Sequence, residues 1–382
     1  MQKPLAPEYV LPDNVFLNRL AGRLEALSSS MLGLCIVALA TSCGGDAIIQ
    51  PPPSSVSEFE QQVEDLRASH HIPAITAVIS KGQQVVWVKA YGVSDRATQR
   101  AAADTTVYHL ASLTKPFAAT VLLQLVEEGK LSLDDPVSMY GINLASPAGT
   151  VIRIRHLLSH TSEGVPGSRY AYNGDRFGLI EAAIVQAAGK PLAAVLQERI
   201  FVPLGLLRTA PNPQSASFAT SGLNKATFEA NMARGYTYTL GGYNPTPYPT
   251  GFGAAAGLTA SALDIASFSM AIDRDALLQP ATKALAYTPV ANPTGGVFPY
   301  GLGWFSTDYK GVRIIWHYGY WTANSSLIIK VPDRELTFVV LANTDGLSSP
   351  YPLGNGRLDT SPWARLFLDT FVIGSVPLAA TP

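Results

Sequence analysis

Ser112 and Lys115 lie three residues apart in the segment Ser-Leu-Thr-Lys, a spacing that puts a hydroxyl and an amine on one face of a helical turn. Pro116 follows, and because proline fits only the first turn of a helix, the helix begins close to Ser112. Free backbone N–H groups at such a terminus suit an oxyanion. The pattern is that of a nucleophilic Ser112. The same pattern also occurs where a serine caps a helix and a solvated lysine follows one turn later, so the motif alone leaves both interpretations open.

Lys115 is the candidate general base. The pKa of a free lysine is about 10.4 and must fall to near 7 before the amine is neutral at physiological pH. Burial, or a second cation close by, can produce such a shift. The hypothesis therefore requires a fold that buries Lys115 or sets a cation beside it.

Three further segments contain histidine, serine or tyrosine residues that could transfer protons or bind substrate. They are His-Leu-Leu-Ser-His-Thr-Ser at 156–162, a tyrosine-rich stretch at 170–180, and Ile-Trp-His-Tyr-Gly at 315–319. On these segments, and on 130–136, 233–236 and 255–264 in the same order, the chain resembles the serine β-lactamase and penicillin-binding-protein family. The resemblance covers about residues 58–345 and is to the class C-like branch, with its family VIII esterases, D-aminopeptidases and D,D-peptidases.

The resemblance implies roles for individual residues. Ser112 becomes the acylated nucleophile and Lys115 its partner. Tyr172 becomes the tyrosine that relays protons to the leaving group, and beside a cationic lysine its phenol is expected to ionise more easily than usual. His317 is expected to help bind substrate and to complete the proton network.

The resemblance also implies an oxyanion hole formed by the backbone N–H groups of Ser112 and Tyr320, next to Gly319. One position departs from the family, which has an asparagine where this chain has Gly174. That asparagine contacts both substrate and lysine in the family, so its loss concerns specificity for β-lactams or peptides and leaves nucleophilic catalysis intact. The neighbouring Asn173 is expected to substitute in part.

Two tyrosines could occupy the position of the proton-relaying tyrosine of the family. Tyr172 precedes Phe177, the first aromatic residue of the next predicted helix, by the five residues typical of the family, and Tyr170 does not. We assign the role to Tyr172 and expect Tyr170 to be a packed aromatic residue.

Other catalytic patterns are missing or incomplete. His156 and His160 have the spacing of a helical metal pair, but Leu157 stands where the zinc motif needs a glutamate, so we expect packing rather than a metal. The chain has neither a Gly-x-Ser-x-Gly elbow nor a phosphate-binding loop. We expect no cofactor and no metal.

These residues must be positioned by strands near both chain ends and by helices between them. The predicted strands are 74–80, 84–91, 300–307, 312–317, 325–331 and 336–343, and the predicted helices are 117–128, 176–188, 192–201 and 261–272. This order predicts an α+β fold in which both chain ends build one antiparallel sheet flanked by helices, with an inserted, mostly helical region. The resemblance implies the β-lactamase/transpeptidase-like form of it. Residues 208–250 are expected to form long surface loops near the site.

Composition narrows the possible partners. The 382 residues are 47% hydrophobic, which supplies a substantial core, and only 14% are charged, with a net charge of −1. No basic field is present to hold nucleic acid. Both cysteines, Cys35 and Cys43, precede residue 44, so the rest of the chain cannot form a disulfide within itself.

The N-terminal segment reads as an export signal. The ten apolar residues 31–40 are too few to span a bilayer and fit the apolar core of a signal peptide, with a short buried helix as the alternative. Small residues then lead to Cys43, as in a lipoprotein cleavage site. We therefore expect a signal segment at 1–42, a lipid-anchored linker at 43–57, a hydrolase domain at 58–372 and a tail at 373–382. Lipid-modified Cys43 would hold the protein in the bacterial cell envelope, on its periplasmic or surface side.

The sequence predicts a serine hydrolase that forms an acyl-enzyme on Ser112 and acts on small esters or on D-amino-acid amides or peptides. A β-lactamase or a D,D-carboxypeptidase is the alternative within the same class. A penicillin-binding-like sensor that binds without turnover is the alternative outside it.

Overall fold

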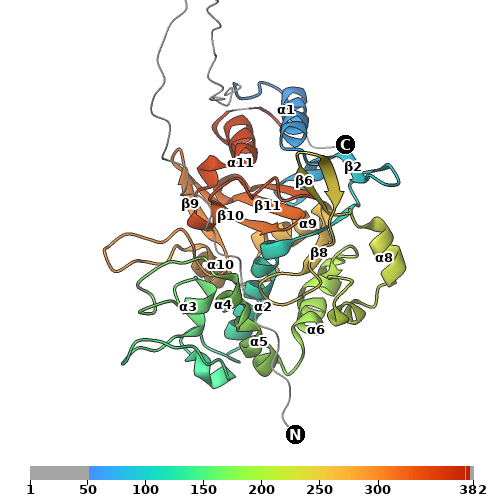
Figure 1. Cartoon of the computed structure of the whole chain (residues 1–382). Coiled ribbons are helices and arrows are strands. Elements are labelled where there is room, and N and C mark those ends of the chain that lie inside the picture. The colour runs from blue at the N-terminus through green and yellow to red at the C-terminus, as the bar shows by residue number, and fades with distance from the viewer. Residues whose placement is uncertain (1–50, 375, 379–382) are drawn as a thin grey trace, which may run out of the picture. The chain divides into compact units, whose positions relative to one another are not determined.

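A seven-stranded antiparallel sheet combines strands from both ends of the chain (Figure 1). The computed structural model describes residues 51–374 and 376–378, and the predictions for the signal segment and Cys43 fall outside that part. In order across the sheet, the strands are β3 (Arg100–Ala101), β2 (Gln84–Asp95), β1 (Ala74–Lys81), β12 (Leu336–Ala342), β11 (Asn324–Val331), β10 (Val312–Trp321) and β9 (Phe305–Tyr309). The β1–β12 pairing joins the two ends and places Ile75 opposite Ala342. The predicted α+β fold with a sheet built from both ends is confirmed.

Alternate residues of β12 point into two hydrophobic cores, one on each face of the sheet. Phe338 belongs to one core and Val339 to the other. The first core includes α1 (Val56–Ser69) and α11 (Pro362–Phe367), and the second includes α2 (Lys115–Glu127) and α9 (Ala262–Asp273). The second core contains the helix that carries Lys115, which places the start of this helix in a buried region.

The predicted strand at 300–307 begins only at Phe305. Gly303, with φ of 85°, turns the chain, and a Cβ at this position would lie 2.4 Å from the Cβ of Ala119 on α2. Close approach to α2 therefore replaces the first part of the expected strand with a glycine turn.

The inserted region is helical but more broken than the sequence suggests. The helix predicted at 176–188 divides at Leu179. The helices of the inserted region are α3 (Ile154–Leu158), α4 (Gly174–Gly178), α5 (Ile180–Ala188), α6 (Leu192–Leu196), a π-helical turn (Gln197–Phe201) and α7 (Val202–Leu204). Another helix, α10 (Pro280–Tyr287), follows α9. The stretch expected as loops, 208–250, contains β5 (Ala210–Pro211), α8 (Lys225–Asn231), β6 (Tyr236–Thr239) and β7 (Gly242–Pro245).

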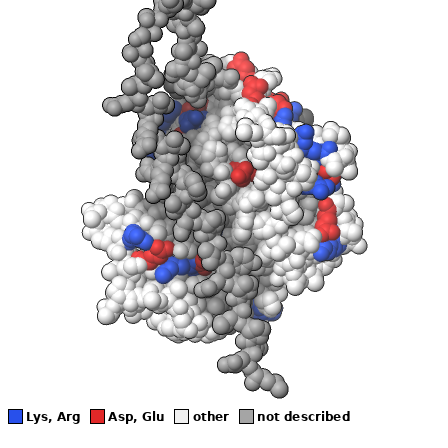
Figure 2. All heavy atoms as spheres, in the orientation of Figure 1, with Lys and Arg blue, Asp and Glu red and all other residues white. Residues whose placement is uncertain are grey.

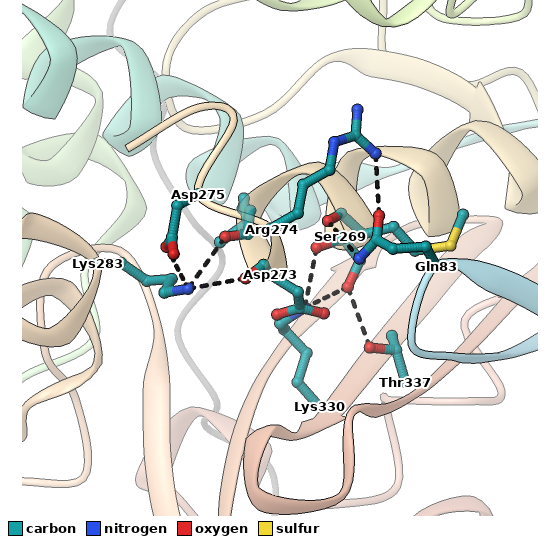
Figure 3. A network of polar contacts seen from close by, with 10 residues as sticks. Gln83, Ser269, Asp273, Arg274, Asp275, Lys283, Lys330 and Thr337 are labelled. Carbon is teal, nitrogen blue, oxygen red and sulfur yellow. Dashed lines mark hydrogen bonds and ion pairs between the residues drawn. The ribbon is translucent and has the colours of Figure 1, made fainter. Parts of the chain in front are cut away.

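A buried lysine fastens α9 to the sheet (Figure 3). The Lys330 Nζ lies 2.9 Å from an Asp273 carboxylate oxygen and contacts the Ser269 hydroxyl, which is 3.1 Å from the Thr337 hydroxyl. Burial lowers the pKa of Lys330, and Asp273 opposes that effect. β8 (Leu258–Ser261) leads directly into α9 and pairs with β4 (Val107–His109), the strand just before Ser112. The network thus fixes the strand against which the nucleophile segment is built.

Charged side chains on the face drawn in Figure 2 form small groups of both signs over a largely uncharged surface. No single helix among residues 51–374 is long and apolar enough to cross a membrane. The helical segments Gly174–Ala188 and Leu192–Leu204 are long and apolar enough only when they are taken together, and the chain bends by 73° between them. Ile184 and Leu196 of this pair are fully buried in the protein core.

Candidate active site

Ser112 lies in a strained turn between β4 and α2. A single turn of 3₁₀-helix, η1 (Ala111–Thr114), runs into α2, whose first turn contains Pro116 as predicted. Ala111 has φ of 49°, a left-handed conformation that a residue with a Cβ rarely adopts. The turn is held from the sheet side, because the Ser326 hydroxyl donates to the Leu110 carbonyl at 2.7 Å.

Gly319 lets the sheet approach this turn. A Cβ at Gly319 would lie 2.0 Å from the Leu110 carbonyl oxygen and 2.3 Å from the Ser326 hydroxyl. Only glycine therefore fits where the end of β10 passes the nucleophile turn. The next residue is Tyr320, whose backbone N–H is the predicted second oxyanion-hole donor and whose side chain is 48% exposed.

Lys115 and Ser112 form a hydrogen-bonded pair. The Lys115 Nζ lies 2.9 Å from the Ser112 Oγ and 3.0 Å from the Ala255 carbonyl oxygen. Lys115 is only 1% exposed, and burial lowers its pKa to about 7 while Asp175 acts in the opposite direction. The shift that the sequence required is supplied by burial, without a second cation.

The pair opens into a cavity of about 420 Å³. Its other lining side chains include His109, Asp175, Glu181, Phe252 and Trp321. Lys115 is the only lysine or arginine among the described residues of this lining, which also contains two carboxylates. A larger cavity, of about 790 Å³, lies around Arg100 and Tyr248 but lacks the serine–lysine pair, so we place the active site in the smaller one.

Tyr172 lies beside the pair, but its phenol is harder to ionise than expected. The Lys115 Nζ is 5.1 Å from the centre of the Tyr172 ring. The hydroxyl is buried without a hydrogen bond of regular geometry, and burial raises its pKa well above the usual range although Ser112 counteracts the effect. The expectation of easier ionisation is wrong, because the desolvation of the phenol outweighs the influence of a lysine that is itself close to neutral.

His160 holds Tyr172 in place from both sides. The Ala171 N–H donates to the His160 carbonyl at 2.9 Å, and the Asn173 N–H donates to the His160 Nδ1 at 3.1 Å. The imidazole and phenol ring centres are 4.3 Å apart. Tyr170 instead donates its hydroxyl to the Gly354 carbonyl at 2.8 Å, as a packed aromatic residue would.

Apart from its place in the His-Leu-Leu-Ser-His-Thr-Ser segment, nothing in the sequence indicates this role of His160. Its partner in the possible metal pair, His156, accepts the Arg153 N–H at Nδ1. No group of three metal-ligating side chains occurs in the described part of the chain.

Asn173 does not take over the function of the missing asparagine. Its Oδ1 accepts the Arg176 N–H at 2.9 Å, capping α4, and its Nδ2 donates to Glu163 at 2.8 Å. The geometry therefore disfavours the expected partial substitution by Asn173, because capping uses its Oδ1 and Glu163 binds its Nδ2. Gly174 does line the cavity, and a Cβ there would be 3.7 Å from the Lys115 Nζ.

His317 lies behind the cavity rather than in its lining. It is fully buried, with Nε2 2.8 Å from the Tyr300 hydroxyl and Nδ1 2.7 Å from the Tyr318 carbonyl oxygen. Burial, and then Lys115, lower its pKa well below the usual range. The geometry differs from the expected substrate contact and favours a positioning role among the aromatic rings around Tyr172.

The family model for beta-lactamase matches residues 59–358. The chain belongs to the beta-lactamase family. The predicted resemblance is confirmed, and as a member of this family the protein is a serine hydrolase.

Known proteins show the same relationship. "Penicillin-binding protein 4*" of Bacillus subtilis (strain 168) is 24% identical across 71% of this chain and 68% of its own length. "Esterase EstB" of Burkholderia gladioli is 26% identical across 39% of this chain, which spans about half (48%) of that protein. The octameric penicillin-binding protein homologue from Pyrococcus abyssi superimposes with a TM-score of 0.71 at 24% identity, over 86% of this chain and 79% of that one, and shows the shared fold.

Lys115 predicts the pH dependence of this beta-lactamase-family enzyme. With neutral Lys115 as the predicted base, kcat/KM should fall as the pH drops below about 7, by about tenfold per pH unit. Asp175 raises the pKa of Lys115, so Asp175→Asn should move this acidic limb to lower pH. Steady-state rates between pH 5 and 9 measure both effects. A limb that stays in place in Asp175→Asn, or that lies near the pKa of a free carboxyl, would contradict the assignment of Lys115 as base.

The two tyrosines form a matched pair of tests. Tyr172→Phe removes the hydroxyl next to the catalytic pair and should reduce kcat by about 100-fold or more, a typical contribution of proton transfer. Tyr170→Phe removes only a hydrogen bond to a backbone carbonyl and should leave kcat nearly unchanged. Both variants are assayed on one ester after their melting temperatures are compared. If Tyr170→Phe lost activity while Tyr172→Phe kept it, the proton-relaying tyrosine would be Tyr170 and not Tyr172.

Proposed function

We propose that this enzyme hydrolyses small esters that carry no carboxylate, through an acyl-enzyme on Ser112. The observation that carries the proposal is the 2.9 Å contact between Ser112 and a buried Lys115 whose pKa is about 7. At that pKa a large fraction of the lysine is neutral at physiological pH and able to accept the serine proton.

The proposed chemistry needs only this chain's residues and water. Lys115 takes the Ser112 proton, the serine oxygen attacks the ester carbonyl, and the backbone N–H groups of Ser112 and Tyr320 stabilise the oxyanion. The proton on Lys115 passes through the Tyr172 hydroxyl to the leaving alcohol as the C–O bond breaks. Tyr172 relays this proton as a neutral phenol, in keeping with its raised pKa. Water then attacks the acyl-enzyme while Lys115 accepts its proton, and this proton passes to the Ser112 oxygen as its bond to the acyl carbon breaks and the acid is released.

The charge of the cavity supports the choice of ester over β-lactam or carboxypeptidase substrates. A β-lactam or a peptide cut at its C-terminus brings a carboxylate into the site. Among the described lining residues, the available charges are the Asp175 and Glu181 carboxylates and a Lys115 that must be neutral to act. A substrate carboxylate would meet like charge without a cationic partner, which disfavours binding. An uncharged ester avoids this penalty, and the relative from Burkholderia gladioli is named an esterase.

Amides of amino acids with a free amine are the second candidate. The same two carboxylates would attract an ammonium group on the substrate. Glu181 is held in the wall by the Ala254 N–H at 3.1 Å, and burial raises its pKa. Amide turnover would nevertheless lack the contact that Gly174 cannot make.

A fluorophosphonate probe tests the proposed acyl-enzyme. We expect a covalent adduct on Ser112, found by peptide mass spectrometry, and loss of both adduct and ester turnover in Ser112→Ala. Phosphonylation needs an activated serine, so Lys115→Ala should label at least about 100-fold more slowly. Folded wild-type protein that takes up no probe would favour a binding protein without turnover.

Gly174 predicts how specificity can be changed. Gly174→Asn restores an amide that donates to amide-bearing substrates, and a Cβ at this position makes only ordinary contact with Lys115. The ratio of kcat/KM for a chromogenic cephalosporin to that for p-nitrophenyl butyrate should rise about tenfold, or about 1.4 kcal/mol. Gly174→Ala is the control, because it adds the Cβ without the amide and should leave the ratio unchanged. An unchanged or lower ratio in well-folded Gly174→Asn would mean that this position does not set specificity.

A further inference from the structure

His109 is a buried histidine in the cavity wall that the proposed chemistry does not use. It is the last residue of β4, pairs with Thr259 of β8, and lies three residues before Ser112. Its side chain is 1% exposed and lines the same cavity as Ser112 and Lys115. A polar ring in this position needs a physical reason, because an apolar side chain would be buried at lower cost.

One edge of the ring is tied to the nucleophile turn. The Ala111 N–H donates to the His109 Nδ1 at 3.1 Å. A backbone N–H can only donate, so Nδ1 accepts and the ring proton lies on Nε2. The Asn324 Oδ1, 3.2 Å from the same nitrogen, would bond to it only in the other tautomer. Burial lowers the pKa of His109 to about 4, which keeps the ring neutral during catalysis.

The opposite edge of the ring has no partner. The His109 Nε2 is buried and makes no hydrogen bond to any residue of the described chain. The Tyr248 ring is stacked on His109, with ring centres 5.5 Å apart and planes 20° apart. His109 lines the cavity that contains Ser112 and Lys115, and Nε2 is the polar atom of its ring that lacks a partner. A buried polar atom without a hydrogen bond needs an explanation, and a role in binding is one.

We propose that His109 is a substrate-binding residue whose Nε2–H donates a hydrogen bond to an acceptor oxygen in the acyl group of the substrate. The proposal rests on the ester hydrolysis proposed above and narrows it. The preferred acyl groups carry an ether, hydroxyl, keto or acylamino oxygen close to the scissile carbonyl. Plain alkanoyl esters are turned over without this contact.

Two substrates and two variants separate the functions of the two nitrogens. p-Nitrophenyl methoxyacetate and p-nitrophenyl butyrate have acyl chains of equal length and differ by an oxygen in place of a methylene. His109→Asn keeps an acceptor near the Ala111 N–H and removes the distal donor. His109→Gln extends an amide N–H toward the position of Nε2 and removes the near acceptor.

We expect His109→Asn to lower the ratio of kcat/KM for the methoxyacetate to kcat/KM for the butyrate by about fivefold to tenfold, mainly through a higher KM for the methoxyacetate. His109→Gln should keep the ratio between the two esters while slowing both, because the turn at Ala111 loses its hydrogen bond. Equal losses on both esters in His109→Asn would overturn the proposal and leave a positioning role. Retained preference in His109→Asn with loss of preference in His109→Gln would overturn it as well.

Two further measurements keep the outcomes distinct. Fluorophosphonate labelling of Ser112 in the wild type reports on the acyl-enzyme independently of His109. An enzyme that is labelled but shows no effect of His109 on ester preference would refute the His109 proposal alone, and an unlabelled wild type would refute both proposals. If both variants unfold below the assay temperature, ¹⁵N NMR of the wild-type imidazoles decides, since a ring protonated on Nδ1 would overturn the donor assignment.

Discussion

The removal of Lys115 from water is the constraint on which the rest of the site depends. The change in its pKa from 10.5 to about 7 corresponds to about 5 kcal/mol of opposition to the charged form. Lys115 is buried as the first residue of α2, and the Ala255 carbonyl accepts a hydrogen bond from its amine. Glu181 in turn holds the neighbouring Ala254 N–H and so fixes the turn above the lysine. The lowered pKa of Lys115 is thus a property of its buried surroundings and not of this residue alone.

A second constraint is the backbone strain at Ala111, in the turn that carries Ser112. Ala111 remains in a left-handed conformation because three elements hold its neighbourhood: His109 accepts its N–H, Ser326 binds the Leu110 carbonyl, and Gly319 lets β10 come close. The Ser326 and Gly319 contacts require the end of β10 and the start of β11 to reach the turn that follows β4, whereas the His109 contact lies within that turn. The central sheet pairs β10 with β11, and β4 pairs with β8, which leads into the helix α9 that the Lys330 network holds.

Much of this was readable in the sequence. The Ser-x-x-Lys spacing with Pro116 predicted the start of α2, and the β-branched runs at both ends predicted the strands of the central sheet. The order of the weak motifs predicted the family. Local patterns of this kind can be read from the sequence because helix start signals and strand alternation each depend on a few neighbouring residues.

Tertiary structure alone decided the chemistry of individual groups. Nothing in the local sequence distinguishes a Tyr172 that ionises easily from one that does not, since the answer depends on how completely other segments exclude water from it. The same holds for Asn173, whose amide is used by Glu163 and by the start of α4, and for His317, which bonds to Tyr300. The sequence by itself determined which side chains were available, the elements that carry them and the family of the fold. Burial, tautomer and hydrogen-bond partner were decided by contacts between residues distant in the chain, because desolvation and hydrogen bonding depend on what surrounds a group in space and not on its neighbours in sequence.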